Sequence, residues 1–176
     1  MSKKTNITGF IIILAFSILL FPTLNSAEQH YLQFSGNGFV PEHSSAAFFR
    51  SPTGYLYHDD FIDESYCCPV TFSVPEGSTY FIKSLGIRYY DNLVDGYIGI
   101  VLRRKNLFTG TWHNVASWTS SSSSSDQTTC HGTISGYKLI DTKKFSYWLE
   151  VLFFRDADLT PGSALKLYQV RVHYGT

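Results

Sequence analysis

Three tryptophans, each near hydrogen-bonding side chains, are the residues of this sequence with the clearest chemical potential. Trp112 and Trp118 fall in one segment with Asn114, and Trp148 lies two residues before Glu150. Residues two apart in a strand share a face, so Trp112, Asn114 and Trp118 are predicted on one face, and Trp148 with Glu150 on the outer face of another strand. Aromatic rings stack on sugars, and amides and carboxylates bind hydroxyls, so the pattern indicates a glycan-binding surface.

The same tryptophans allow two other interpretations. If Val115 is exposed instead of buried, Trp112 and Trp118 belong to the hydrophobic core. If the rings point outward and a second copy of the chain covers them, they form a subunit contact, because exposed aromatic patches often mark interfaces. The sequence leaves the three interpretations open, and the expected partner is a surface glycan or a second copy of this chain.

Acidic side chains in three predicted loops form candidate sites for calcium. They are Asp59, Asp60, Asp63 and Glu64 in the first loop, Asp91, Asn92 and Asp95 in the second, and Asp156 and Asp158 in the third. Calcium takes six to eight oxygen ligands, many of them loop carboxylates. No loop has the spacing of an EF-hand, and Asp, Asn and Gly are also common in simple turns. Calcium is therefore a possible cofactor, no other is expected, and solvated turns are the alternative.

Signals for catalysis are few. His58, Asp59, Asp60 and Glu64 are the one place where an imidazole and carboxylates crowd together, and two carboxylates can hydrolyse a glycosidic bond. The sequence contains no G-x-S-x-G or H-E-x-x-H motif and no phosphate-binding glycine loop. We therefore expect a non-catalytic surface or structural interaction protein that can pack with copies of itself through its aromatic faces. A carbohydrate-binding module is the alternative, and a glycan hydrolase is less favoured.

Three cysteines give the sequence one candidate disulfide. In an exported protein, Cys130 is expected to pair with Cys67 or Cys68. Successive residues of a strand point to opposite faces, so only one of the adjacent pair should face Cys130, and the sequence does not say which. A zinc site that adds His131 is a weaker alternative, because adjacent cysteines lack the usual two-residue spacer.

The N-terminus has the layout of a secretory signal peptide. Lys3 and Lys4 precede the apolar run Phe10–Phe21, Pro22 follows, and Asn25–Ala27 supplies small residues for cleavage. A retained membrane anchor is the alternative, but a spanning helix needs about 20 apolar residues. We expect cleavage near Ala27, one domain over residues 28–176, an extracellular or periplasmic location, and no membrane association after cleavage.

Composition excludes some classes of function. Without Lys3 and Lys4, the 14 Lys and Arg residues fall to 12, against 14 Asp and Glu residues, so the mature chain carries a net charge of −2. Nucleic-acid binding depends on excess positive charge, so we expect no nucleic-acid partner. The one basic run, Arg103–Lys105, is predicted as a solvated strand end.

The elements that must position these residues are strands. Apolar and polar residues alternate, and turn signals separate the alternating segments. The clearest segments are Val70–Val74, Tyr80–Tyr90, Tyr97–Arg104, Trp112–Trp118, Phe145–Phe154 and Leu165–Tyr174. The expected core faces contain Leu85, Ile87 and Tyr89; Ile98, Ile100 and Leu102; Phe145, Tyr147, Leu149, Val151 and Phe153; and Tyr168, Val170, Val172 and Tyr174. Thr119–Ser125, with six serines, is predicted as a loop. The pattern predicts an all-β protein, an antiparallel β-sandwich of jelly-roll type, with a closed β-barrel as the alternative.

Several strand and turn motifs resemble an uncharacterised family of exported bacterial single-domain β proteins. The motifs are Ile87–Asn92, Leu102–Leu107, Thr109–Gly110, Tyr147–Val151 and Leu167–Tyr174. Gln169 departs from the pattern, which has a small residue at that position. The resemblance implies a β-sandwich and export, and it implies no activity.

Overall fold

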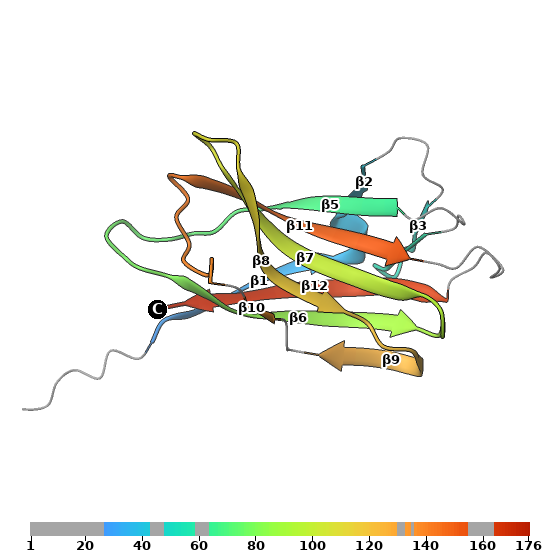
Figure 1. Ribbon diagram of the computed structural model, residues 1–176. Coiled ribbons are helices and arrows are strands. Elements are labelled where there is room, and N and C mark those ends of the chain that lie inside the picture. The colour runs from blue at the N-terminus through green and yellow to red at the C-terminus, as the bar shows by residue number, and fades with distance from the viewer. Residues whose placement is uncertain (1–26, 43–47, 59–63, 130–132, 135, 155–163) are drawn as a thin grey trace, which may run out of the picture.

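The computed structural model describes residues 27–42, 48–58, 64–129, 133–134, 136–154 and 164–176 (Figure 1). Two antiparallel sheets pack face to face, and the described residues contain a single short 3-10 helix, Gly36–Gly38. Within them, no helix has the length and apolar character needed to span a bilayer. Several predictions fall outside the described residues, namely those on the signal peptide before Ala27 and on Asp59, Asp60, Asp63, Cys130, His131, Asp156 and Asp158.

Twelve strands of the described residues form the two sheets. They are β1 (Gln29–Ser35), β2 (Val40–Pro41), β3 (Phe48–Arg50), β4 (Leu56–His58), β5 (Glu64–Val70), β6 (Phe81–Asp91), β7 (Tyr97–Asn106), β8 (Trp112–Thr119), β9 (Ser123–Thr129), β10 (Thr133–Ile134), β11 (Phe145–Phe154) and β12 (Leu165–Gly175). The predicted serine loop is partly wrong, because Ser123–Ser125 begin the edge strand β9.

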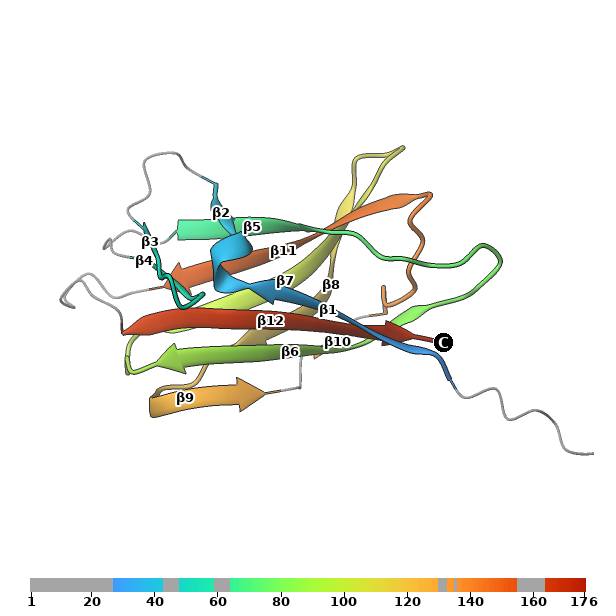
Figure 2. The same ribbon diagram turned by 180° about the vertical axis from the view of Figure 1, so that it is seen from behind.

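The strands divide into sheet A, in the order β3-β4-β12-β6-β9 with β1 also paired to β12, and sheet B, in the order β10-β8-β7-β11-β5-β2. The chain crosses between the sheets repeatedly, as from β5 to β6, β6 to β7, β8 to β9 and β11 to β12. Figures 1 and 2 show β5 and β9 at opposite sides of the sandwich. The jelly-roll sandwich is confirmed, and the alternative of a closed barrel is wrong.

The core lies between the sheets and follows the predicted alternation. Of the expected core faces, those of β6 and β7 and most of those of β11 and β12 are buried. Alternation works because successive strand residues point to opposite sides, so one face of each strand reaches the shared apolar layer. The side chains on the outer faces of the two sheets remain accessible for binding.

A β-bulge in β8 interrupts the alternation. Asn114 pairs with Arg103, and Ala116 pairs with Leu102, the residue directly before Arg103. Val115 is therefore one extra residue in β8, and both Val115 and Ala116 are buried. An extra residue reverses which face the following side chains occupy.

The bulge separates the two tryptophans of β8. Trp112 and Asn114, before the bulge, lie on the outer face of sheet B. Trp118, after it, packs against the core, with its ring centroid 4.7 Å from that of Tyr89. The prediction that Trp112 and Trp118 share one outer face is wrong for this reason, and Trp118 is partly buried against the core.

A second bulge, in β12, moves a predicted core residue outward. Leu167 pairs with Tyr89 and Gln169 pairs with Arg88, so Tyr168 is the extra residue. Tyr168 does not share the buried face of the residues that follow it. Its phenol lies beneath the Arg88 guanidinium, 5.1 Å from the ring centroid, on the outer side of sheet A. The prediction of a buried Tyr168 is wrong.

Candidate functional site

Arg103 is the centre of the outer face of sheet B. One guanidinium nitrogen lies 3.0 Å from Oε1 of Glu150, on the neighbouring strand β11. The guanidinium carbon lies 4.7 Å from the ring centroid of Trp112 on β8. The ion pair fixes the guanidinium, and the cation–π contact then fixes the indole. Trp112 is nevertheless 55% exposed, so much of its ring area faces solvent in a defined orientation.

The strand register brings the other predicted residues to the same place. Asn114 of β8 and Trp148 of β11 are the direct neighbours of Arg103 on its two sides. Trp148 is half-buried, and it alternates with the buried residues of β11, so it faces outward. Four of the five predicted binding residues, Trp112, Asn114, Trp148 and Glu150, therefore surround Arg103 on one face. Trp118 packs against the core instead, and it borders the neighbouring groove over Gly99.

A groove of about 220 Å³ continues this face along β7. Its floor is at Gly99, whose neighbours across the sheet are Thr119 and Leu152. Beyond Gly99, the rings of Tyr97 and Phe154 stack with centroids 4.9 Å apart. A glycine inside a strand leaves room for the close approach of another group, and here it leaves the groove open between the Arg103 cluster and the stacked rings.

Sequence reasoning missed two of the residues that build the site. The sequence predicts Arg103 at a solvated strand end. Because successive strand residues point to opposite faces, Arg103 lies on the outer face and pairs with Glu150. Arg104 points inward and is buried, and it donates to the carbonyl oxygens of Tyr137 and Leu139 at 3.2 and 3.3 Å. A glycine inside a strand was the signal that could have identified Gly99.

A thiol and two carboxylates meet beside the Arg103 cluster. Ligand atoms of Glu42, Cys67 and Glu150 all lie within 4.8 Å of one another. Burial, followed by the negative charges of Glu42 and Glu150, raises the pKa of Cys67 to about 11. The thiol is therefore protonated at neutral pH, and its Sγ lies 3.7 Å from Oε1 of Glu42 as a weak donor. This donor set could accept a divalent ion if the thiol lost its proton.

The adjacent cysteines point to opposite faces, as alternation predicts. Cys67 is half-buried on the outer face, whereas Cys68 is buried in the core, so the two thiols do not converge on one metal ion. Both are free thiols within the described part of the chain. Cys130, the predicted disulfide partner, lies outside it. Strand β9, which ends at Thr129, lies on the opposite side of the sandwich from β5 (Figures 1 and 2).

The described calcium candidates do not converge on one site. Glu64 begins β5 in sheet B and is buried, and it has interaction partners within the protein. His58, its proposed catalytic partner, ends β4 in sheet A. Asp95 is exposed in the turn between β6 and β7, and Asn92 is exposed beside Asp91.

Asp91 links sheet A to sheet B through hydrogen bonds. It is fully buried, and its Oδ1 accepts from the backbone amide of Leu93 at 3.1 Å. Its Oδ2 accepts from the Ser120 hydroxyl, whose oxygen in turn accepts from the amide of Ile98 at 2.7 Å. Both carboxylate oxygens are therefore used inside the protein, as in a turn cap.

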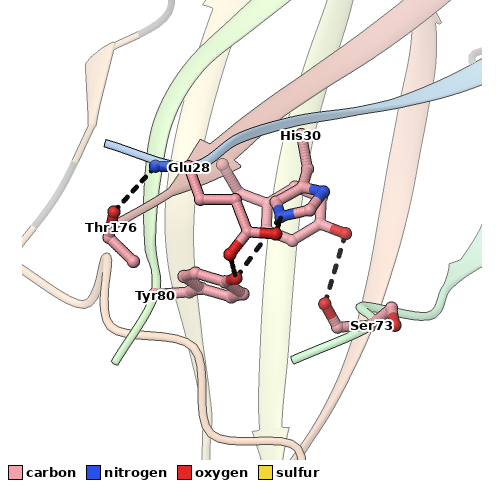
Figure 3. A network of polar contacts seen from close by, with 6 residues as sticks. Glu28, His30, Ser73, Tyr80 and Thr176 are labelled. Carbon is pink, nitrogen blue, oxygen red and sulfur yellow. Dashed lines mark hydrogen bonds and ion pairs between the residues drawn. The ribbon is translucent and has the colours of Figure 1, made fainter. Parts of the chain in front are cut away.

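A separate polar cluster ties the first strand to the last (Figure 3). The Glu28 carboxylate lies between His30, at 3.0 Å, and the Tyr80 hydroxyl, which donates to it. This hydrogen bond, followed by burial, raises the pKa of Tyr80 to about 12. The Glu28 amide donates to Oγ1 of Thr176 at 3.0 Å. The contacts join β1 to the end of β12 and to the segment before β6.

The turn between β7 and β8 presents apolar side chains to water. Oδ1 of Asn106 accepts from the amides of Phe108 and Thr109 at 2.9 and 3.2 Å, and Gly110 has a φ of 74°. The turn is thus built to one shape, yet Leu107 is 58% and Phe108 80% exposed. In Figures 1 and 2 the turn projects beyond both sheets. Exposed apolar clusters of this kind mark contact surfaces.

No protein-family model matches the sequence, and no curated protein matches it. Solved structures with a similar fold include the Podospora anserina GH26-CBM35 β-(1,4)-mannanase (8% identity over 81% of this chain, TM-score 0.46) and a family two carbohydrate esterase from Cellvibrio japonicus (10% over 85%, 0.44). A third is that of infectious bursal disease virus, Gx strain (10% over 84%, 0.41). The matches cover 27%, 34% and 32% of those chains, so this chain spans about a third of their length. Each of these three TM-scores is below 0.5, so the likeness carries no argument about function.

Proposed function

We propose that this protein is an exported, non-catalytic binding domain, and that it holds a carbohydrate chain on the outer face of sheet B. The observation that carries the proposal is the exposed Trp112 ring, fixed by Arg103 at the end of the groove over Gly99. A sugar ring presents an apolar face to an indole, and its hydroxyls bind neighbouring amide, carboxylate and guanidinium groups.

The geometry suits an extended ligand. From Tyr97 to Lys105, strand β7 covers eight residue steps, which correspond to about 27 Å at the usual strand rise. Trp112 and Trp148 lie at one end of this path, and the stacked Tyr97 and Phe154 rings lie at the other. The aromatic groups are thus separated by a length that accommodates several sugar units.

The same contacts favour binding over catalysis. Glu150, the carboxylate next to Arg103, is paired with its guanidinium at 3.0 Å. A carboxylate that hydrolyses a glycosidic bond must donate or accept a proton, or attack the sugar, and Oε1 of Glu150 is instead engaged by the Arg103 guanidinium. Glu150 is therefore placed to orient Arg103 and to bind hydroxyl groups.

Isothermal titration calorimetry with soluble neutral polysaccharides tests the proposal. We expect at least one of xyloglucan, galactomannan, mixed-linkage glucan and starch to bind. The Trp112→Ala and Trp148→Ala variants should each weaken that binding at least tenfold, about 1.4 kcal/mol. Tyr31→Ala is the matched control, because Tyr31 is also 55% exposed but lies in β1 of sheet A. Equal losses in the tryptophan and Tyr31 variants, or no binding to any polysaccharide, would contradict the proposal.

Self-association is a second candidate, favoured by the exposed turn. Leu107 and Phe108 form an apolar tip held in a fixed shape, and a second copy of the chain could cover it. Light scattering after size exclusion, at micromolar concentration, should then give a mass above that of one chain. Phe108→Ser should restore the monomer mass, whereas Val94→Ser, at another highly exposed apolar residue, should not. A monomer mass for the unmodified protein removes this candidate.

A further inference from the structure

The outer face of sheet A has a different character from that of sheet B. Its strands β1, β12, β6 and β9 contain four lysine or arginine residues, Lys83, Arg88, Lys166 and Arg171, and two acids, Asp91 and Asp126. Asp91 is fully buried, so Asp126 is the single acid that these four strands present to solvent. The face therefore attracts anions, although the chain as a whole carries no excess of positive charge.

Two arginines of this face flank a small hollow. Arg171 pairs with Gly86, and Arg88 follows Gly86 by two residues, so the arginines are diagonal neighbours on adjacent strands. Diagonal neighbours have Cβ atoms about 7–8 Å apart. Gly86 contributes no side chain between them, and a hollow of about 50 Å³ results, which Gln169 and Thr128 also line. The space suits a charged group of a few atoms.

The two guanidinium groups are unequally neutralised. Arg88 pairs with Asp126 at 3.3 Å and lies over the Tyr168 ring. Arg171 is exposed and lies over the ring of Tyr31, 5.7 Å from its centroid. Within the described chain, no carboxylate is paired with Arg171. One full positive charge is thus available beside the hollow, together with the remaining donors of Arg88.

A larger groove opens directly beside the hollow. Its volume is about 410 Å³, and it shares Arg88 and Gln169 with the hollow. Gln33 and Tyr168 line it as well, and the Gln169 amide donates to the Gln33 side chain at 2.9 Å. The Tyr168 hydroxyl donates to Asp126 at 3.1 Å, which fixes the ring. Planar amides, a fixed phenol ring and guanidinium donors are the groups that bind sugar hydroxyls and sugar faces.

We propose that this face is a second site, specific for an acidic carbohydrate chain. The carboxylate or sulfate of one sugar unit occupies the hollow over Gly86 between Arg171 and Arg88. The adjoining sugar ring lies in the groove against Tyr168, where Gln33 and Gln169 bind its hydroxyls. Guanidinium groups bind oxyanions through paired, charge-assisted hydrogen bonds, so the charged group supplies most of the selectivity. The site is separate from the neutral-sugar face of sheet B and does not depend on it.

Calorimetric titration with oligogalacturonate at low salt tests the second site. We expect oligogalacturonate to bind, and its methyl-esterified form, which keeps the sugar ring and loses the charge, to bind at least tenfold more weakly. Arg171→Gln should weaken binding of the acid form about tenfold. Gln169→Ala should weaken it by a smaller factor. Lys143→Gln is the control, because it removes the same charge from an exposed side chain elsewhere. Trp112→Ala should leave this binding unchanged, which separates it from the function proposed for sheet B.

Further probes identify the group that is recognised. A sulfated galactan oligosaccharide that binds with the same dependence on Arg171 extends the site from carboxylate to sulfate sugars. Inorganic polyphosphate, a polyanion without sugar rings, should bind more weakly than oligogalacturonate. The proposal is overturned if polyphosphate binds equally well, if esterification has no effect, or if Arg171→Gln and Lys143→Gln weaken binding to the same extent. Absence of binding to both acidic sugars also overturns it.

Discussion

Replacing Asp91 with alanine should destabilise the protein strongly, although the residue sits in a polar turn at the end of β6. Its carboxylate accepts from the Leu93 amide and from the Ser120 hydroxyl, and Ser120 in turn holds the Ile98 amide at the start of β7. Alanine removes both acceptors at a fully buried position and leaves the partly buried Leu93 amide and Ser120 hydroxyl without these partners. The prediction is a loss of stability with no loss of fold.

The magnitude follows from the two lost hydrogen bonds. Hydrogen bonds to a charged group contribute about 1.5–3 kcal/mol each, so Asp91→Ala should lower the free energy of unfolding by about 3–6 kcal/mol. Asp91→Asn keeps one acceptor oxygen and should lose about half as much. Asp95→Ala is the matched control, because Asp95 is an exposed acid in the same turn, and its effect should stay within about 0.5 kcal/mol.

Urea unfolding followed by tryptophan fluorescence measures these free energies. A double-mutant cycle of Asp91→Ala with Ser120→Ala should show a coupling of at least about 1 kcal/mol, because the two residues belong to one network. The reasoning is refuted if Asp91→Ala costs less than about 1 kcal/mol, or no more than Asp95→Ala. It is also refuted if calcium stabilises the unmodified protein and this stabilisation disappears in Asp91→Ala, since Asp91 would then be a metal ligand.

Other predictions concern single groups of the structure. The alkylation rate of Cys67 should keep rising until about pH 11, because burial and then the charge of Glu42 raise the pKa of the thiol. Glu42→Gln should lower the pH at which the rate is half-maximal. A half-maximal rate near the ordinary pKa of 9.0 in the unmodified protein would contradict this environment of the thiol. The free energy of unfolding should fall as pH rises from about 10 to about 12, because the folded protein keeps the Tyr80 proton that the unfolded chain loses. Tyr80→Phe should reduce that slope, and an unchanged slope would count against the Glu28 hydrogen bond. Gly99→Ala should leave stability nearly unchanged, since the nearest atom to the new Cβ, Cε2 of Tyr97, would lie 3.5 Å away. The added methyl group should nevertheless narrow the groove and weaken glycan binding.

Strict alternation allowed the sequence to predict the sandwich and most of its core. In β7 and β11 every predicted inward residue but Phe145 is buried, because these strands run without irregularity along the positions concerned. Phe145 is half-buried at the beginning of β11 and packs against the core. In regular strands, the alternation of apolar and polar residues alone therefore predicts which side chains are buried.

Two errors in the predicted faces come from β-bulges. Val115 in β8 and the extra residue at Tyr168 in β12 each shift the side chains by one position. One shift carries Trp118 into the core, and the other carries Tyr168 out to Arg88. A bulge depends on the pairing partner, which lies far away in the sequence, so no local pattern in these segments could have indicated it.

The sequence indicated most residues of the candidate site, but it did not indicate Arg103, which lies at its centre. Trp112, Trp148 and Glu150 attract attention by type, and the structure brings them to one face. Arg103 joins them only because β7 lies between β8 and β11 in sheet B. The spacing of residues along the sequence does not predict this order of strands. The same holds for the pairing of Arg171 with Gly86, which builds the hollow on the other sheet.

The three indole N–H signals in a ¹H–¹⁵N NMR spectrum test the central claim most directly. Each tryptophan gives one such signal, and Trp→Phe variants assign the three. On titration with a bound neutral oligosaccharide, the signals of Trp112 and Trp148 should shift more than the signal of Trp118, which is half-buried against Tyr89 and borders the groove. A shift of Trp118 alone, or no shift of Trp112 at saturating ligand, would contradict a sugar-binding face centred on Arg103.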